Sequence, residues 1–192
     1  MWLPWVFSTG WASGVSAYLA VLQLGLLDRF LDLGGVPDTL ARTDVMIAAG
    51  CMYAIEFVTD KIPLVDTAWD VVHTLIRPTI GIALGLLMSG DADTLAQAAA
   101  GATGGVTAFL SHATKASARL VLNASPEPVT NTIASLGEDL TVASVIALLV
   151  VAPWVAASVV AVLMVLGLVL VWRIQRRLRQ AIAARRFHRS PS

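Results

Sequence analysis

The sequence predicts an all-α membrane protein, a polytopic bundle of about six spans arranged as two inverted three-span repeats. Its composition is the first reason, because 57% of the 192 residues are hydrophobic and only 14% are charged, against about 25% charged in a typical soluble domain. The mean hydropathy is +0.76. Apolar runs near the roughly 20 residues that cross a bilayer recur along the chain. An internal repeat and an uneven distribution of basic residues are the second and third reasons.

The expected spans follow the apolar runs, at about residues 5–30, 45–58, 64–88, 94–112, 140–152 and 155–172. They form a single transmembrane domain, residues 1–172, followed by a basic cytoplasmic tail, residues 173–192. Pro78 is expected to interrupt the third span. Residues 140–172 are too few for two full spans and too many for one straight span. Pro153 therefore either separates two spans or kinks one long helix.

The repeat aligns residues 10–19 with residues 101–110, and five of the ten positions are identical. In each half, about 5–88 and 94–172, a polar connection, a short span, a proline and a longer span follow. Because each half has three spans, the halves would insert with opposite orientations, and inverted repeats place a transport pathway at their interface. The alternative is that two glycine-rich helices are alike only in composition.

Arginine and lysine are distributed unevenly. With six spans, the seven arginines of the tail lie on the same side as Lys61, Lys115 and Arg119, and only Arg29 and Arg42 lie on the other side. Basic residues concentrate in cytoplasmic loops. Both termini are therefore expected in the cytoplasm. The tail is also expected to contact anionic lipid, and we expect no binding of nucleic acid.

Four ionisable side chains form one stripe on the third span, at Asp66, Asp70, His73 and Arg77. On a helix that advances about 100° per residue they fall within an arc of roughly 60°. Such groups are expensive in lipid and usually mark a pathway. The alternative is a structural ladder of ion pairs, Asp70 to His73 and His73 to Arg77. No metal site is expected, because the stripe holds a single histidine.

Two further polar groups flank this stripe. Glu56, Asp60 and Lys61 end the second span, where the two acids either pair with His112, Lys115 or Arg119 from the fourth span or mark a solvated helix end. Glu127, Asn131, Ser135 and Glu138 have helical spacing and predict a short amphipathic helix, either an interfacial connector or a gate. The candidate pathway residues are Asp66, Asp70, His73, Arg77, Glu56, Asp60, Lys61, Glu127, Asn131 and Glu138.

Several of these motifs resemble a bacterial family of integral membrane proteins, domain of unknown function 4126. The resemblance rests on GVSAY at 14–18, EFVTDKIP at 56–63, the stripe through Arg77, and SPEP at 125–128 with the polar positions that follow. It implies a multi-pass protein of the bacterial inner membrane and supplies no activity. The arrangement of halves also resembles trimeric intracellular cation channels in architecture.

We therefore expect a protein that moves a small ion or polar solute, as a channel or a secondary transporter. The alternative is a non-transporting membrane module that binds lipid or a partner membrane protein. We expect no enzymatic activity and no cofactor. A homo-oligomer packed through glycine faces is expected, because a bundle of 20.3 kDa is small.

Overall fold

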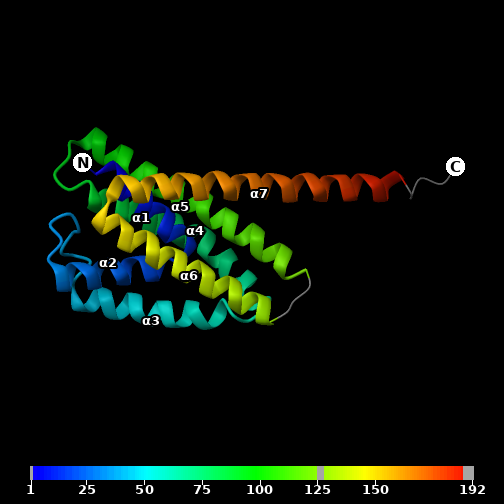
Figure 1. The fold of residues 1–192 in the computed structure, drawn as a ribbon, viewed down its shortest axis with the longest axis horizontal. Helices are drawn as coiled ribbons and strands as arrows, with labels where there is room; N and C mark the ends of the chain where they lie inside the picture. Colours follow the sequence, from blue (N-terminus) through cyan, green and yellow to red (C-terminus); the bar gives the residue numbers. More distant parts are fainter. Residues whose placement is uncertain (1, 125–127, 188–192) are drawn as a thin grey trace.

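The computed structural model describes residues 2–124 and 128–187, which form seven helices joined by short connections (Figure 1). The helices are α1 (Leu3–Val15), α2 (Ala17–Leu31), α3 (Thr43–Thr59), α4 (Val65–Met88), α5 (Thr94–Leu122), α6 (Pro128–Val151) and α7 (Pro153–Phe187). Three segments are long and apolar enough to cross a membrane: Val65–Met88, Val129–Val151 and Pro153–Arg177. The predicted all-α class is confirmed for the described residues, and these segments are consistent with a membrane protein.

The first expected span is two helices that fold back on each other, because Gly35 after α2 lies beside Trp5 of α1. A single span over residues 5–30 is therefore wrong, and the N-terminus lies at the opposite end of the bundle from the end of α7 (Figure 1). α1 ends at Val15 and α2 begins at Ala17, with Ser16 in an extended conformation between them (φ −148°, ψ 94°). This break leaves carbonyl groups at the end of α1 that no helical N–H occupies. Two of them accept hydrogen bonds from buried cations, the Gly14 carbonyl from Arg77 at 3.0 Å and the Val15 carbonyl from Lys115 at 3.1 Å.

Prolines act differently at two positions. α4 continues through Pro78 without ending, because neighbouring helices in a membrane bundle can support a helix that lacks one backbone hydrogen bond. The expected interruption there is wrong. By contrast, Pro153 is the first residue of α7, and only Ala152 separates it from the end of α6; the first position of a helix suits its fixed φ. Of the two alternatives for residues 140–172, the structure has two separate helices.

α6 also includes the polar segment that was expected to form a helix of its own. It runs without interruption from Pro128 to Val151, so Asn131, Ser135 and Glu138 lie on the first turns of the same helix whose second half is apolar. Asn131 and Ser135 are buried. The interpretation of this segment as a separate interfacial connector is wrong, since these turns are part of the bundle.

Glycine permits close contact between α1, α4 and α5. A Cβ atom on Gly14 would overlap Ala108 of α5, and one on Gly85 of α4 would overlap the backbone of Ala100 of α5. Gly81 and Gly104 approach each other in the same way. These glycine faces are buried within one chain, so they are not the contact between copies that the sequence led us to expect.

The glycines aligned by the repeat have different neighbours. Gly10 and Gly14 meet α5, whereas the aligned Gly101 and Gly105 meet side chains of α4. The two halves therefore use their matching glycines in different packing contacts. α1 and α5 also run parallel, since Gly10 meets Gly104 and Gly14 meets Ala108, so the opposite orientation expected for these aligned segments is wrong.

The interior has an apolar half and a polar half. Around the α6–α7 connection, buried apolar side chains of α1, α2, α6 and α7 pack together, among them Val6, Leu24, Ile146 and Val160. Toward the α3–α4 turn, the buried side chains are mostly ionisable. α7 continues past the other helices as a single rod (Figure 1).

Replacement of Gly85 by alanine is expected to destabilise the protein, because the added methyl group would overlap the α5 backbone. Overpacking typically costs about 1–3 kcal/mol, which corresponds to a fall in melting temperature of roughly 2–12 °C for a chain of this size. Thermal unfolding in detergent, followed by circular dichroism, measures it. Gly137→Ala on α6 is the matched control, since a Cβ there meets no atom within 4 Å. Equal melting temperatures for the two variants would contradict this packing.

Candidate functional site

Arg77 is the centre of the polar half, and its side chain is completely buried. One terminal nitrogen donates to Glu56 Oε1 of α3 at 2.7 Å, in a buried ion pair. The other lies 3.0 Å from the Gly14 carbonyl and 3.0 Å from Nδ1 of His112 on α5. Glu56 in turn accepts a hydrogen bond from Ser16 Oγ at 2.9 Å. One guanidinium thus joins α1, α3 and α5 to α4.

The contacts of His112 fix which ring nitrogen carries the proton. Arginine can only donate, so Nδ1 of His112 accepts from Arg77. Nε2 therefore holds the hydrogen and donates to the Asp70 backbone carbonyl at 3.1 Å, with Thr74 Oγ1 at 3.2 Å. In this arrangement His112 is a neutral bridge between α5 and α4.

His73 faces another part of the bundle. Its Nδ1 lies 2.9 Å from the Trp69 carbonyl, and its Nε2 lies 3.0 Å from the hydroxyl group of Tyr18 on α2. A carbonyl can only accept, so Nδ1 is the donor. The stripe therefore does not form the ladder Asp70–His73–Arg77, because its members bond to groups on α1, α2, α3 and α5.

A second ionic group joins α3, α5 and α6. Lys115 Nζ donates to Asp60 Oδ2 at 2.6 Å and to the Val15 carbonyl at 3.1 Å, and it lies 3.4 Å from Glu138 Oε2. Arg119 holds the Glu138 carboxylate with two nitrogens, at 3.2 and 2.6 Å, and donates to the Asp60 carbonyl at 2.8 Å. Bidentate pairs of this kind are among the strongest hydrogen bonds in proteins. Of the two alternatives for the end of the second span, pairing with the fourth span is confirmed for Asp60, whereas Glu56 pairs with Arg77 of α4 instead.

Asp66 is held by amide groups. Its carboxylate accepts from Asn123 Nδ2 at 2.8 and 3.0 Å and from Asn131 Nδ2 at 3.0 Å. The Thr67 backbone N–H donates to it at 2.6 Å, and Arg119 lies 3.6 Å away. Both Asp66 oxygens are therefore satisfied inside the bundle.

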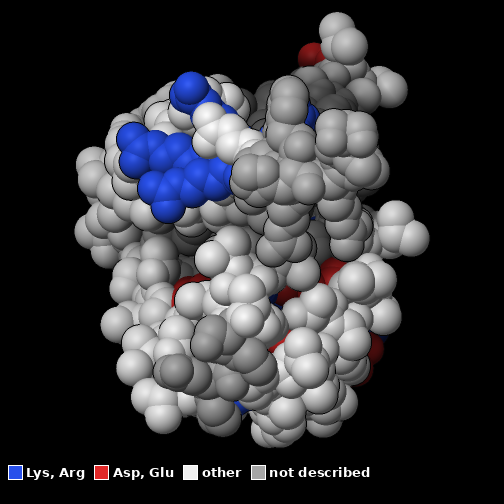
Figure 2. Space-filling model, turned by 90° about the vertical axis from the view of Figure 1, so that its right-hand side faces the viewer, with Lys and Arg blue, Asp and Glu red and all other residues white. Residues whose placement is uncertain are grey.

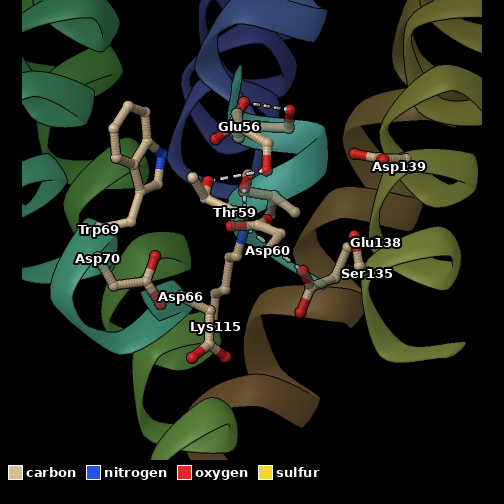
Figure 3. Close-up of polar contacts among 12 residues, drawn as sticks. Glu56, Thr59, Asp60, Asp66, Trp69, Asp70, Lys115, Ser135, Glu138 and Asp139 are labelled. Carbon is tan, nitrogen blue, oxygen red and sulfur yellow. Dashed lines mark hydrogen bonds and ion pairs between the residues drawn. The ribbon is translucent and has the colours of Figure 1, made fainter. Parts of the chain in front are cut away.

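Asp70 differs from these acids. Its side chain is buried, yet neither carboxylate oxygen has a hydrogen-bond partner among the described residues. Its closest cation is Arg77, 3.6 Å from Oδ1. In Figure 3 the carboxylate projects from α4 toward the place where Lys115 and Asp60 meet. Asp60 Oδ1 and the indole nitrogen of Trp69 are likewise buried without a partner, so polar atoms with free bonding capacity gather in the cluster.

The cluster has more acids than bases. Among the described residues, its ion pairs join five carboxylates to three cations. The carboxylates are those of Glu56, Asp60, Asp66, Asp70 and Glu138, and the cations are Arg77, Lys115 and Arg119. The neighbouring Asp139 and Lys61 add one charge of each sign. When every acid is ionised, two negative charges have no protein counter-charge. Because charges interact strongly in a low-dielectric interior, this excess favours a cation in the cluster.

The remaining predicted residues lie at the edge of the cluster. Lys61 donates to the Phe57 carbonyl at 2.7 Å, and its Nζ lies 2.9 Å from the centre of the Phe57 ring. Ser135 Oγ of α6 is 3.4 Å from the same nitrogen. Glu127 lies outside the described residues.

Three cluster members were missed as candidate site residues: His112, Lys115 and Arg119, named from the sequence only as partners or topology markers. All three are buried, so Lys115 and Arg119 are not loop charges and do not count toward the cytoplasmic bias. Their spacing of i, i+3 and i+7 places them on one helix face. This spacing, directly after an apolar run, was the sequence signal that could have identified the three residues as part of the site.

Comparison with known proteins identifies a family without an activity. The family model described as "Domain of unknown function (DUF4126)" matches residues 3–173, nearly the whole chain. No curated protein and no solved structure matches.

Arg77→Gln and Asp70→Asn are expected to have very different effects on stability. Arg77→Gln leaves Glu56 buried without its counter-charge, and breaking such a pair costs about 3–5 kcal/mol. Asp70→Asn keeps the shape and breaks no side-chain hydrogen bond, so we expect a change within about 1 kcal/mol. Chemical or thermal unfolding in detergent measures both. If Asp70→Asn were as damaging as Arg77→Gln, Asp70 would be a structural ion-pair partner.

Proposed function

We propose that this chain, which belongs to the family described as "Domain of unknown function (DUF4126)", moves a small cation across a membrane through the polar cluster between α3, α4, α5 and α6. The cluster would be the pathway of a channel or a secondary transporter. Asp66, Asp70, His73 and Arg77 would line it from α4. Glu56, Asp60 and Lys61 would contribute from α3, and Asn131 and Glu138 from α6.

One observation carries the proposal: Asp70 is a buried acid with no hydrogen-bond donor among the described residues, in a cluster with excess negative charge. A purely structural network is expected to satisfy each of its buried acids, because an unpaired buried charge is costly. A site that binds and releases a cation needs an acid that the protein itself leaves unsatisfied. Asp70 has this property, whereas Asp66 does not.

The membrane arrangement that goes with this function has five spans and one re-entrant pair of helices. α1 and α2 would enter and leave on one side, since Trp2 and Trp5 at the start of α1 line one pocket with Gly34 and Gly35 after α2, and α3 to α7 would cross a bacterial inner membrane, with the basic end of α7 in the cytoplasm and the N-terminus on the other side. A helix end within the membrane is tolerated where it is buried in protein or lines a polar cavity, and its free carbonyls can help to form a site. The break at Ser16 supports this arrangement, since it brings two carbonyls to the cluster. Assembly into a homo-oligomer stays a prediction.

A second candidate function is a non-transporting membrane module that binds lipid or a partner membrane protein. The observation in its favour is that Arg77, Lys115 and Arg119 are all held by several acceptors. Such a network would be a rigid scaffold closed to solvent.

Flux measurements in proteoliposomes test the proposal. With a panel of small cations, anions and pH gradients, we expect cation or proton flux that Asp70→Asn lowers at least about tenfold, because the site loses the carboxylate to which no described side chain donates a hydrogen bond. Asp91→Asn is the matched control, since Asp91 is exposed in the α4–α5 connection. Absence of flux for every ion, in a correctly folded protein, would reject transport.

Solvent access separates the two candidates independently of the ion chosen. After replacement of the exposed Cys51 by serine, cysteines introduced at positions 70 and 73 should react with aqueous thiol reagents if the cluster is a pathway. Inert cysteines in a folded protein would favour the closed module.

A further inference from the structure

A cavity of about 430 Å³ lies beside the polar cluster, between α1, α5, α6 and α7. Its walls are mostly apolar, with Trp11 from α1 and Leu163 and Met164 from α7. Lys115 and Glu138 also line it, so the same space contacts both apolar surface and the ionic group. This volume lies within the range of small-molecule sites, roughly 300–1,000 Å³.

The helix arrangement explains why the cavity exists. α6 and α7 separate after Ala152, and α5 crosses the space between them (Figure 1). Gly137 of α6 lines the cavity and has no atom within 4 Å of where its Cβ would lie. Figure 2 shows acidic atoms in hollows of the end face, below the basic side chains of α7. The Glu138 side chain is 22% exposed, so the ionic cluster is not completely enclosed.

The charged lining of the cavity consists of a buried base and a partly exposed acid. Lys115 donates to the Val15 carbonyl and to Asp60, forms an ion pair with Glu138 at 3.4 Å, and has a side chain that is only 3% exposed. The Glu138 side chain is 22% exposed, whereas those of Glu56, Asp60, Asp66 and Asp70 are 5% exposed or less. A carboxylate offers about four lone-pair positions, and Arg119 and Lys115 do not fill all of them. Glu138 is therefore the acid of the cluster that a ligand in the cavity can reach.

We propose that this cavity binds a monovalent organic cation with an apolar body, its charged end at Glu138 and its body against Trp11, Leu163 and Met164. The inference rests on the proposed function and names the substrate class of the same site. Charge complementarity selects this ligand over a lipid phosphate or a fatty-acid carboxylate, because the ion pairs of the cluster join more carboxylates than cations and the accessible charge is that of Glu138, 22% exposed, whereas Lys115 is 3% exposed. An anion of the same shape is rejected by the same excess.

Binding of two ions of matched shape tests the inference. Purified protein in detergent is titrated with tetraphenylphosphonium and with tetraphenylborate, followed by calorimetry and by quenching of Trp11 fluorescence, taken as the difference from Trp11→Phe. We expect the cation to bind at least about tenfold more tightly than the anion. Glu138→Gln should weaken cation binding by about tenfold or more, as expected for one lost charge-assisted contact.

Gly137→Leu provides a variant that leaves every ion pair intact. Its side chain would occupy the cavity, and we expect it to abolish binding of the cation. Gly50→Leu on α3 is the matched control, because a Cβ at Gly50 meets only the ends of Leu22, at 4.0 Å, and Gly50 is not among the cavity-lining residues. This control should bind as the natural protein does.

Two results would overturn the inference. Equal binding of cation and anion would identify an apolar groove without charge selection, the property of a lipid site. Cation binding unaffected by Gly137→Leu would place the ligand elsewhere. Failure of this inference can be distinguished from failure of the proposed function. Flux of small inorganic cations without binding of tetraphenylphosphonium would reject the organic cation as ligand but not transport. Binding of tetraphenylphosphonium without flux of any ion would reject transport but not the cation site.

Discussion

A guanidinium group with no contact to solvent governs the polar half of this protein. Moving an ion from water into an apolar interior costs several kcal/mol even after relaxation, so Arg77 on an otherwise apolar helix is acceptable only with several acceptors around it. Those acceptors come from three other helices: the Glu56 carboxylate, the Gly14 carbonyl and Nδ1 of His112. The positions of α1, α3 and α5 around α4 follow from this requirement.

The break at Ser16 follows from the same constraint. Carbonyl groups within a continuous helix are occupied by N–H groups one turn later, whereas those at a helix end are free and carry the negative end of the helix dipole. Ending α1 at Val15 therefore supplies two neutral acceptors for buried cations, Gly14 for Arg77 and Val15 for Lys115. Backbone acceptors stabilise a cation without adding an acid, which leaves Asp70 free of that role.

The sequence predicted the features that depend on a single helix, and it did not predict those that depend on contacts between several helices. The buried stripe on α4 was predictable, because four ionisable groups on one face of an apolar helix cannot face lipid. The break at Ser16 was not, since no proline or glycine stands at that position and the cause is a cation on another helix. Lys115 and Arg119 follow an apolar run and resemble a solvated helix end. Their burial depends on Asp60 and Glu138, which are distant in sequence.

The bases and the acids of the cluster have different roles, and this difference connects the scaffold to the proposed activity. Each of the three cations is fixed by several acceptors, so the bases hold the helices together and contribute little that a solute could use. The acids outnumber them. Among the described residues, hydrogen-bond partners are missing at both oxygens of Asp70 and at Oδ1 of Asp60, and Glu138 is the acid that is partly exposed. Negative charge that the protein does not neutralise repels anions and attracts cations. The same surplus that costs stability therefore provides selectivity, and removing it by mutation is expected to make the bundle more stable and less able to bind a cation.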